Sequence, residues 1–194
     1  MTAVRHPSMT EAEYLAYDLA HEGKHEFYNG EIVAMAGASL AHALVTMNIG
    51  GALRTLLRRS PCRVFSADLR VLIEDTGAYV YPDLTVVCGT PELRPTNPQT
   101  LTNPKVVVEV LSSSNAGHDR GPKAAHYRRV ASLAAYLLVD IESRRIEAYY
   151  RGDDGVWRLD EAQGEAELPV RALNIVLPLP EAWEGLEQIG EGTG

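Results

Sequence analysis

The chain has 194 residues, a length that favours one domain with a sizeable core. Its 26 acidic and 18 basic residues give a net charge of −8. This balance argues mildly against nonspecific nucleic-acid binding, which relies on Lys and Arg to neutralise phosphates. No apolar run is long enough to span a bilayer, and residues 1–17 lack an apolar signal-peptide core. We therefore expect a single cytoplasmic domain over residues 1–194, without a membrane partner.

The first elements along the chain are a helix, a hairpin and a second helix. Residues 8–20 have helical character, with Ser8 or Thr10 as the cap. Residues 24–36 predict a hairpin, because an Asn-Gly dipeptide is a strong turn signal. Residues 39–59 show the longest helical pattern, with arginines near the C-terminal end, where the helix dipole favours cations.

Strands follow in the middle of the chain. Residues 63–73 predict one strand and residues 78–88 another, whose paired part starts after Pro82 because proline lacks a backbone donor. A polar, proline-rich loop is expected over residues 89–103. Residues 105–111 are mostly valine, a composition typical of a strand buried on both faces.

The last predicted elements are a helix and a hairpin. The helix covers about residues 122–132 and starts at Pro122, a good first helical residue. The hairpin joins strands at residues 135–141 and 145–151, and an irregular or short-stranded tail follows. This order of elements favours an α/β or α+β fold, with a mixed sheet flanked by helices and additional antiparallel strands.

The two cysteines, Cys62 and Cys88, have no metal-ligand spacing and no disulfide-rich context. We interpret both as buried apolar side chains. Basic residues form two clusters along the chain, which are most simply explained as solvated helix faces. The first contains Arg54, Arg58 and Arg59, and the second contains Arg120, Lys123, Arg128 and Arg129.

An acid, Glu109, lies in the middle of the valine-rich strand PKVVVEVL. Burying a lone carboxylate is costly unless it is paired, protonated or metal-bound. Asp83 starts the preceding strand in YPDLTVV, so the two acids can meet at one end of a sheet. Like charges at this distance require protonation or a cation, and Mg²⁺ or Mn²⁺ suits carboxylate oxygens. The alternative is a Glu109 that is protonated or paired with an arginine.

Lys123 falls in the first turn of the helix that follows Glu109, and Tyr127 shares its helical face because it lies four residues further on. Taken alone, Lys123 is most simply an exposed lysine of a first helical turn.

Together these segments resemble the PD-(D/E)XK nuclease superfamily. The matching features are YPD, then VVVEVLS, then Asp119, Lys123 and Tyr127. The chain is similar in particular to the restriction-endonuclease-like proteins of the Uma type, through KHEFYNGEIV, His42, SADLRV and AYLLVDIES. The match covers about residues 24–149 and continues weakly to the tail. It implies a restriction-endonuclease-like fold, a central mixed sheet flanked by helices.

The resemblance also implies a core at about residues 24–150 and a site. Asp83 and Glu109 match the paired acids of the superfamily. The usual lysine position, two residues after Glu109, holds Leu111, so the lysine is assigned to Lys123 in the following helix. The implied ligands of Mg²⁺ (or Mn²⁺) are Asp83, Glu109, the Val110 carbonyl and Glu26.

The implied reaction is metal-assisted hydrolysis of phosphodiester bonds in DNA. Lys123 would orient the attacking water or stabilise the charge of the transition state, and Tyr127 would position Lys123 or the phosphate. His42 could act as a base, line the site or be structural. Asp68 could join the acids or pair with Arg70.

Asp119 could cap the helix or orient Lys123, and capping is the simpler role. Three functions remain open: a Mg²⁺-dependent endodeoxyribonuclease, a catalytically silent binding protein with the nuclease fold, and a metal-dependent hydrolase of another substrate. The occurrence together of Asp83, Glu109 and Lys123 supports the first, and the acidic net charge supports the second. Nucleases of this fold often pair to cut two strands, so we expect a homodimer.

Overall fold

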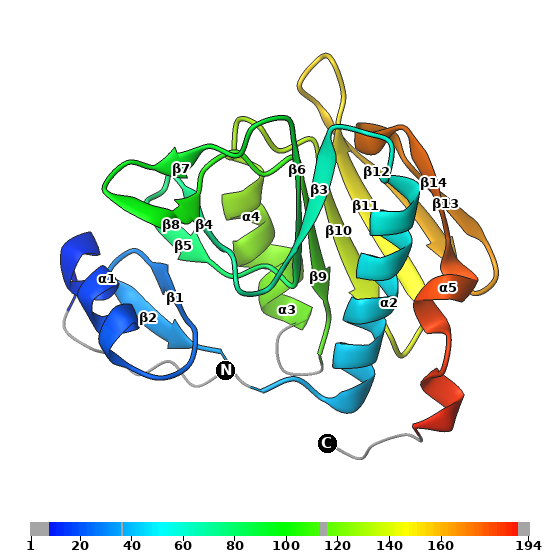
Figure 1. Ribbon diagram of the computed structural model, residues 1–194, viewed down its shortest axis with the longest axis horizontal. Coiled ribbons are helices and arrows are strands. Elements are labelled where there is room, and N and C mark those ends of the chain that lie inside the picture. The colour runs from blue at the N-terminus through cyan, green and yellow to red at the C-terminus, as the bar shows by residue number, and fades with distance from the viewer. Residues whose placement is uncertain (1–7, 36, 113–115, 190–194) are drawn as a thin grey trace.

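The chain folds into two six-stranded sheets and a two-stranded sheet, with helices on the faces of the larger sheets (Figure 1). The structure is a computed structural model that describes residues 8–35, 37–112 and 116–189. The mixed α/β architecture predicted from the sequence is confirmed. No helix in these ranges is long and apolar enough to cross a membrane.

Sheet A contains the N-terminal hairpin. Its order is β2 (Glu31–Ala34), β1 (His25–Tyr28), β5 (Ala78–Val80), β4 (Arg70–Ile73), β8 (Asn97–Leu101) and β7 (Leu93–Arg94). Strands β4 and β8 are parallel, and the other neighbours are antiparallel. Helix α1 (Glu11–Ala20) packs on the outer face through Tyr14. Its cap is Thr10, which forms a capping box with Glu13.

Sheet B contains the valine-rich strand at its centre. Its order is β12 (Trp157–Gln163), β11 (Arg145–Arg151), β10 (Ala135–Asp140), β9 (Val106–Val110), β6 (Leu84–Cys88) and β3 (Cys62–Ser66). Only β9 and β10 are parallel among the neighbours of this sheet.

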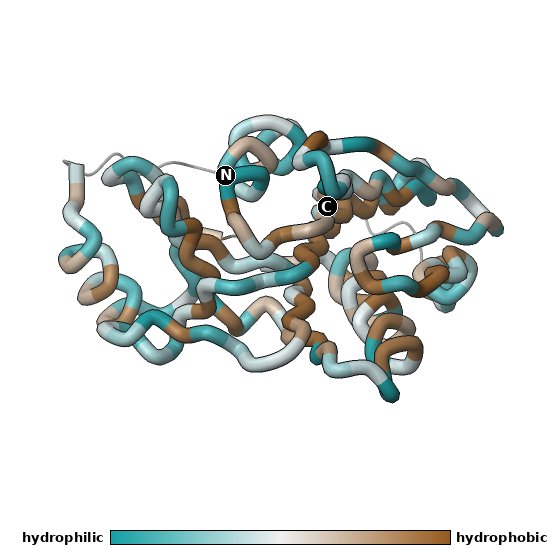
Figure 2. The backbone as a smooth tube through the Cα atoms, turned by 90° about the horizontal axis from the view of Figure 1, so that it is seen from above, coloured by the Kyte–Doolittle hydropathy of each residue, from teal (hydrophilic) through white to brown (hydrophobic). Residues whose placement is uncertain are grey.

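One face of sheet B is covered by the long helix and the C-terminal elements. These are α2 (Leu40–Leu56), α5 (Leu179–Trp183) and the pair β13 (Glu167–Val170) and β14 (Ile175–Pro178), with short 3₁₀ turns η2 (Arg171–Leu173) and η3 (Leu186–Gln188). Val106, Val108 and Val110 of β9 belong to the core on this face. Figure 2 shows hydrophobic segments gathered near the centre of the molecule and hydrophilic turns outside.

The other face of sheet B packs toward sheet A through a short helical segment. It consists of α3 (Ala116–His118), a π-helical turn η1 (Asp119–Lys123) and α4 (Ala124–Tyr127). Val107 and Leu111 contribute to the core between the sheets, together with Tyr127. Because side chains alternate along a strand, Glu109 faces this inner layer with Val107 and Leu111.

Three predicted boundaries are wrong. The expected strand over residues 63–73 is divided by a turn into β3 and β4, which belong to different sheets. The expected strand over residues 78–88 is likewise divided around Pro82 into β5 and β6. The expected loop over residues 89–103 contains β7 and β8, which pair with each other and extend sheet A.

The helix expected over residues 122–132 begins earlier, at Ala116, and its last helical residue is Tyr127. Pro122 lies inside the π-helical turn instead of starting the helix. A π turn widens the backbone ring, and such turns are frequent at functional sites. It places Asp119 and Lys123 on the same side of the segment, where their side chains can interact.

Cys62 is buried in the core and Cys88 is partly buried against it, in keeping with their interpretation as buried apolar side chains, but their covalent pairing was not predicted. Strands β3 and β6 are paired so that the two cysteines lie directly opposite each other, and they form a disulfide. The sequence spacing of the cysteines contains no sign of this pairing, which depends on the register of the two strands.

Candidate active site

Four buried acids and one buried lysine meet where β6 begins and β9 ends. The acids, called here the acidic cluster, are Glu26, Asp83, Glu109 and Asp119. Glu26 comes from β1 of sheet A, whereas Asp83 and Glu109 come from sheet B and Asp119 comes from the π turn between the sheets. The lysine is Lys123. The cluster is therefore built from both sheets and from the segment that separates them.

The pairing of β6 with β9 places Asp83 next to Glu109. These strands are antiparallel, and Leu84 lies opposite Val108, so Asp83 is at the same level as Glu109. The Oδ2 atom of Asp83 accepts a hydrogen bond of 2.7 Å from the backbone N–H of Val110. This bond fixes the carboxylate at the end of the strand.

Lys123 connects the two sheets electrostatically. Its Nζ atom lies 2.7 Å from Oε1 of Glu109 and 2.9 Å from Oε1 of Glu26. The ammonium therefore bridges two buried carboxylates, which is the charge compensation that Glu109 requires. The interpretation of Lys123 as an exposed residue of a first helical turn is wrong, since only 4% of the residue is exposed.

Two tyrosines complete the hydrogen bonding of the bridged acids. Tyr127 donates its hydroxyl to Oε1 of Glu109 at 2.7 Å, and Tyr28 donates to Oε2 of Glu26 at 2.8 Å. The backbone N–H of Tyr81 donates to Oε1 of Glu26 at 3.0 Å. Tyr28 was not predicted as part of the site. Its position two residues after Glu26 was the available signal, because residues i and i+2 of a strand share a face.

Burial and neighbouring charges shift the pKa values of Glu109, Asp119 and Lys123. Burial raises the pKa of Glu109 well above its usual range; Lys123 offsets this in part, and the neighbouring carboxylates add to it. Burial also raises the pKa of Asp119 to about 6, against the opposing charge of Lys123. Burial disfavours the charge of Lys123, but the surrounding acids, Glu109 first, outweigh it and raise the pKa of the ammonium.

His42 lies in the first turn of α2 and contacts the cluster. Its Nε2 atom is 3.2 Å from Oδ2 of Asp83. Burial lowers the pKa of His42, but hydrogen bonds to Asp83 and to the Val110 backbone outweigh that effect, so the pKa is raised. Asp83 thus accepts a hydrogen bond from the Val110 N–H and lies beside the imidazole of His42.

The donor chemistry of the acidic cluster suits Mg²⁺ or Mn²⁺, because both prefer carboxylate and carbonyl oxygens. The arrangement is different from a preformed metal site. Among the described residues, no group of three or more His, Cys, Asp or Glu side chains is placed so that it could hold an ion. The space between Glu26 and Glu109 is bridged by the Lys123 ammonium. The acids fit a metal by type, and Lys123 compensates their charge in this arrangement.

Two other acids differ from their expected roles. Asp68 lies outside the acidic cluster, with 81% of its side chain exposed, and it pairs with Lys24 at 2.7 Å instead of Arg70. Arg70 pairs with Asp18 at 2.6 Å. The simpler role of Asp119, helix capping, is also wrong, because it follows helical residues and neither carboxylate oxygen has a hydrogen-bond partner among the described residues.

The second basic cluster does not form a single solvated face. Lys123 is buried in the acidic cluster, Arg120 pairs with Asp140 and Glu147, and Arg129 pairs with Asp75. From the first cluster, Arg54 and Arg58 line a surface pocket of about 640 Å³ together with Arg63.

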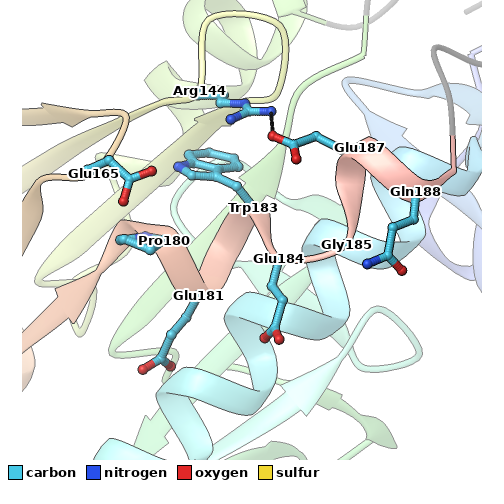
Figure 3. Close-up of a pocket in the computed structure, with 9 residues that line it drawn as sticks. All are labelled: Arg144, Glu165, Pro180, Glu181, Trp183, Glu184, Gly185, Glu187 and Gln188. Carbon is cyan, nitrogen blue, oxygen red and sulfur yellow. Dashed lines mark hydrogen bonds and ion pairs between the residues drawn. The ribbon is translucent and has the colours of Figure 1, made fainter.

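A further pocket, of about 420 Å³, lies between α5 and the turn before β11 (Figure 3). Trp183 forms part of its wall, and an ion pair between Arg144 and Glu187 crosses it at 3.1 Å. Neither pocket is lined by a residue of the acidic cluster.

Comparisons with known proteins identify the family of the chain and several relatives. Residues 11–180 match the family described as "Uma2: Putative restriction endonuclease". Two proteins of Synechocystis sp. (strain ATCC 27184 / PCC 6803 / Kazusa) are similar. One, the uncharacterized protein sll1609, is 36% identical over 157 residues, covering 81% of this chain and 89% of the relative. The other, the uncharacterized protein slr1290, is 32% identical over 180 residues, covering 93% of this chain and 94% of the relative.

A solved structure has the same fold. It is the crystal structure of a putative nuclease belonging to DUF820 from Anabaena variabilis ATCC 29413. The two structures superpose with a TM-score of 0.73 at 15% identity, over 90% of this chain and 97% of the other. The family match covers most of the chain, including every member of the acidic cluster, and the chain therefore belongs to the Uma2 family.

Proposed function

We propose that this chain is a metal-dependent endonuclease that hydrolyses phosphodiester bonds in DNA. Family membership supports a nuclease-type activity. The observation that carries the proposal is the Lys123 ammonium between Glu26 and Glu109, with Asp83 held beside Glu109 by the Val110 N–H. Burying this many acids with a lysine costs folding free energy. Such clusters are typical of catalytic sites, so a catalytic role explains this one better than a purely structural role.

Each residue of the site has a separate task in this proposal. Asp83, Glu109, Glu26 and the Val110 carbonyl would hold Mg²⁺ or Mn²⁺. The chemistry that such an ion supplies is Lewis-acid activation of the phosphoryl group and a more acidic water. Lys123 would place its ammonium against the negative charge that develops on the phosphoryl oxygens. Tyr127 would help to position Lys123 or the scissile phosphate. Its hydroxyl donates to the same oxygen of Glu109 that the Lys123 ammonium contacts.

The test is a cleavage assay with plasmid DNA, linear duplex, single-stranded DNA and RNA, with Mg²⁺ or Mn²⁺ added. The wild type should cleave DNA, and Glu109→Gln should reduce the rate by about a hundredfold or more, the scale on which single electrostatic groups act. Asp68→Asn is the matched control, because it also removes one carboxylate, but from an exposed position outside the cluster. Cleavage by Glu109→Gln at the wild-type rate would contradict the proposal.

A second candidate is a catalytically silent binding protein that retains the nuclease fold. The low exposure of the cluster favours it, since its four acids and Lys123 are each at most 8% exposed, and so does the net charge of −8. Calorimetric titration with Mn²⁺ separates the candidates. A silent protein should show no binding that depends on Glu109. A hydrolase of another substrate should bind Mn²⁺ through Glu109 and cleave none of the nucleic acids.

Nucleases of this fold often pair so that each protomer cuts one strand of a duplex, and by this analogy we propose a homodimer as the active form. Light scattering of the purified protein at several concentrations measures this state. A mass of one chain under conditions of full cleavage activity would exclude it.

A further inference from the structure

Asp119 is the one acid of the cluster whose charge the described residues leave without a hydrogen bond. It is 1% exposed, and both of its carboxylate oxygens lack a hydrogen-bond partner among the described residues. The Nζ atom of Lys123 lies 3.8 Å from its Oδ1 atom, beyond hydrogen-bonding distance. Buried polar groups are nearly always hydrogen-bonded, so an unpartnered carboxylate at this position needs an explanation.

Each of the other three acids has at least one hydrogen-bond or ion-pair partner. Glu109 accepts from Lys123 and Tyr127, and Glu26 accepts from Lys123, Tyr28 and the Tyr81 backbone. Asp83 accepts from the Val110 N–H and lies beside His42. Lys123 is thus held on the side of the glutamates, while Asp119, four residues earlier on the same π turn, faces the same ammonium from farther away. A shift of the ammonium by roughly 1 Å would bring it into hydrogen-bonding distance of Asp119.

We propose that Asp119 receives the Lys123 ammonium when a divalent cation binds to the acidic cluster and takes over the neutralisation of Glu26 and Glu109. Lys123 is then the counter-ion of the acids in the metal-free site. When the cation binds, the ammonium exchanges the glutamates for Asp119, which is a positioning residue that keeps the lysine close to the site. The proposal rests on the metal site of the proposed function. It explains why Asp119 is buried without a hydrogen-bond partner among the described residues, because Lys123 would supply that hydrogen bond once the cation is bound.

Charge and geometry both favour this exchange. The cluster holds four carboxylates, one ammonium near three of them and the imidazole of His42 beside Asp83, so it has an excess of negative charge when all four are ionised. A divalent cation can therefore bind without expelling the lysine from the site. Lys123 is buried, and moving it to bulk water would leave Asp119 uncompensated in a low-dielectric surrounding. Transfer to Asp119 keeps both charges paired.

The first experiment follows Lys123 directly. The chain has three lysines, Lys24, Lys105 and Lys123, so protein labelled with ¹³Cε- and ¹⁵Nζ-lysine gives three resolvable side-chain signals. On titration with Mg²⁺, the Lys123 signal should shift to saturation while the other two stay constant. In Asp119→Asn, the saturated Lys123 signal should differ from that of the wild type. The control Asp68→Asn should alter only Lys24, with which Asp68 pairs.

The second experiment is a double-mutant cycle in which Mn²⁺ affinity is measured by calorimetry. Asp119→Asn should weaken binding about tenfold or more, the scale of one charge-assisted hydrogen bond. In a Lys123→Met background, which has no ammonium to receive, Asp119→Asn should change the affinity by less than about twofold. If Lys123→Met does not fold without metal, the lysine signals of the wild type and Asp119→Asn decide the question alone.

The outcomes separate this inference from the proposed function. An unchanged Lys123 signal at metal saturation overturns the inference, and so does an equal effect of Asp119→Asn in both backgrounds, which would make Asp119 a direct ligand. If either result occurs in a protein that cleaves DNA, the proposed function survives. Metal binding with the expected lysine shift but without cleavage refutes the nuclease proposal alone. Absence of any Mn²⁺ and Mg²⁺ binding refutes both.

Discussion

Replacing Lys123 with methionine tests the central interaction of the site. The substitution keeps an unbranched apolar stem and removes the ammonium that lies 2.7 Å from Glu109 and 2.9 Å from Glu26. Removing one partner of a buried ion pair costs about 3–5 kcal/mol. Glu109 keeps the Tyr127 hydroxyl, and Glu26 keeps the Tyr28 hydroxyl and a backbone N–H. We therefore expect Lys123→Met to lower the free energy of unfolding by about 3 kcal/mol at pH 7, the lower end of that range. This loss corresponds to a decrease in Tm of about 6–12 °C for a chain of this size.

The assay is urea unfolding in EDTA at pH 7 and at pH 5. The pKa of Glu109 is raised in the fold, so the folded state binds protons more tightly than the unfolded state. Loss of Lys123 raises this pKa further, and the cost of Lys123→Met should therefore shrink as the pH falls from 7 to 5. Lys24→Met is the matched control, because Lys24 pairs with an exposed acid and should cost less than about 1 kcal/mol. A Lys123→Met protein within about 1 kcal/mol of the wild type at pH 7 would refute the reasoning.

Three further outcomes follow from the structure. Because the pKa of Asp119 is raised from 3.8 to about 6, its burial costs stability that grows as the pH rises through this range. Asp119→Asn should stabilise the metal-free protein by about 2–3 kcal/mol at pH 7 and by little at pH 4, and equal unfolding midpoints at pH 7 would contradict this. Replacing both Cys62 and Cys88 by serine should lower the free energy of unfolding by about 3 kcal/mol without reductant, because their disulfide closes a loop with a sequence separation of 26; an unchanged urea midpoint would speak against it. Tyr127→Phe removes one hydrogen bond to Glu109, so DNA cleavage should slow by about tenfold while the Mn²⁺ affinity changes little, and a large loss of affinity would instead indicate a role in metal binding.

Much of the fold could be predicted because its elements have strong local signals. The valine-rich strand became β9, the two hairpins formed around the expected turns, and residues 39–59 became α2. The errors arose where the chain passes between sheets. The turn between β3 and β4 contains no glycine or proline, so residues 63–73 have the pattern of one continuous strand. Which sheet each half joins depends on pairing with distant strands, a long-range property that local patterns do not contain.

The candidate site was partly accessible in the same way. Strand patterns and the resemblance indicated Asp83, Glu109, Lys123 and Glu26 as members. The burial of Lys123 could not be predicted, because helical spacing gives the face of a residue and not what packs against that face. The bridge from Lys123 to Glu26 depends on the position of the helical segment α3–η1–α4 between the two sheets (Figure 1). That Asp119 has no hydrogen-bond partner in the described part of the chain likewise depends on the π turn, which has no established sequence signature.

The chain alternates between the sheets, from β3 to β4 and from β5 to β6, and this routing has a consequence for proteolysis and truncation. Neither sheet is a contiguous stretch of sequence, so no single cut releases one of them intact. Glu26 also reaches Lys123 only when the N-terminal hairpin is docked against the rest of the molecule. Fragments that lack the residues before α2 should therefore keep Asp83, Glu109 and Asp119 but lose the contact between Glu26 and Lys123. The complete site forms only when the N-terminal hairpin and the rest of the chain have folded together.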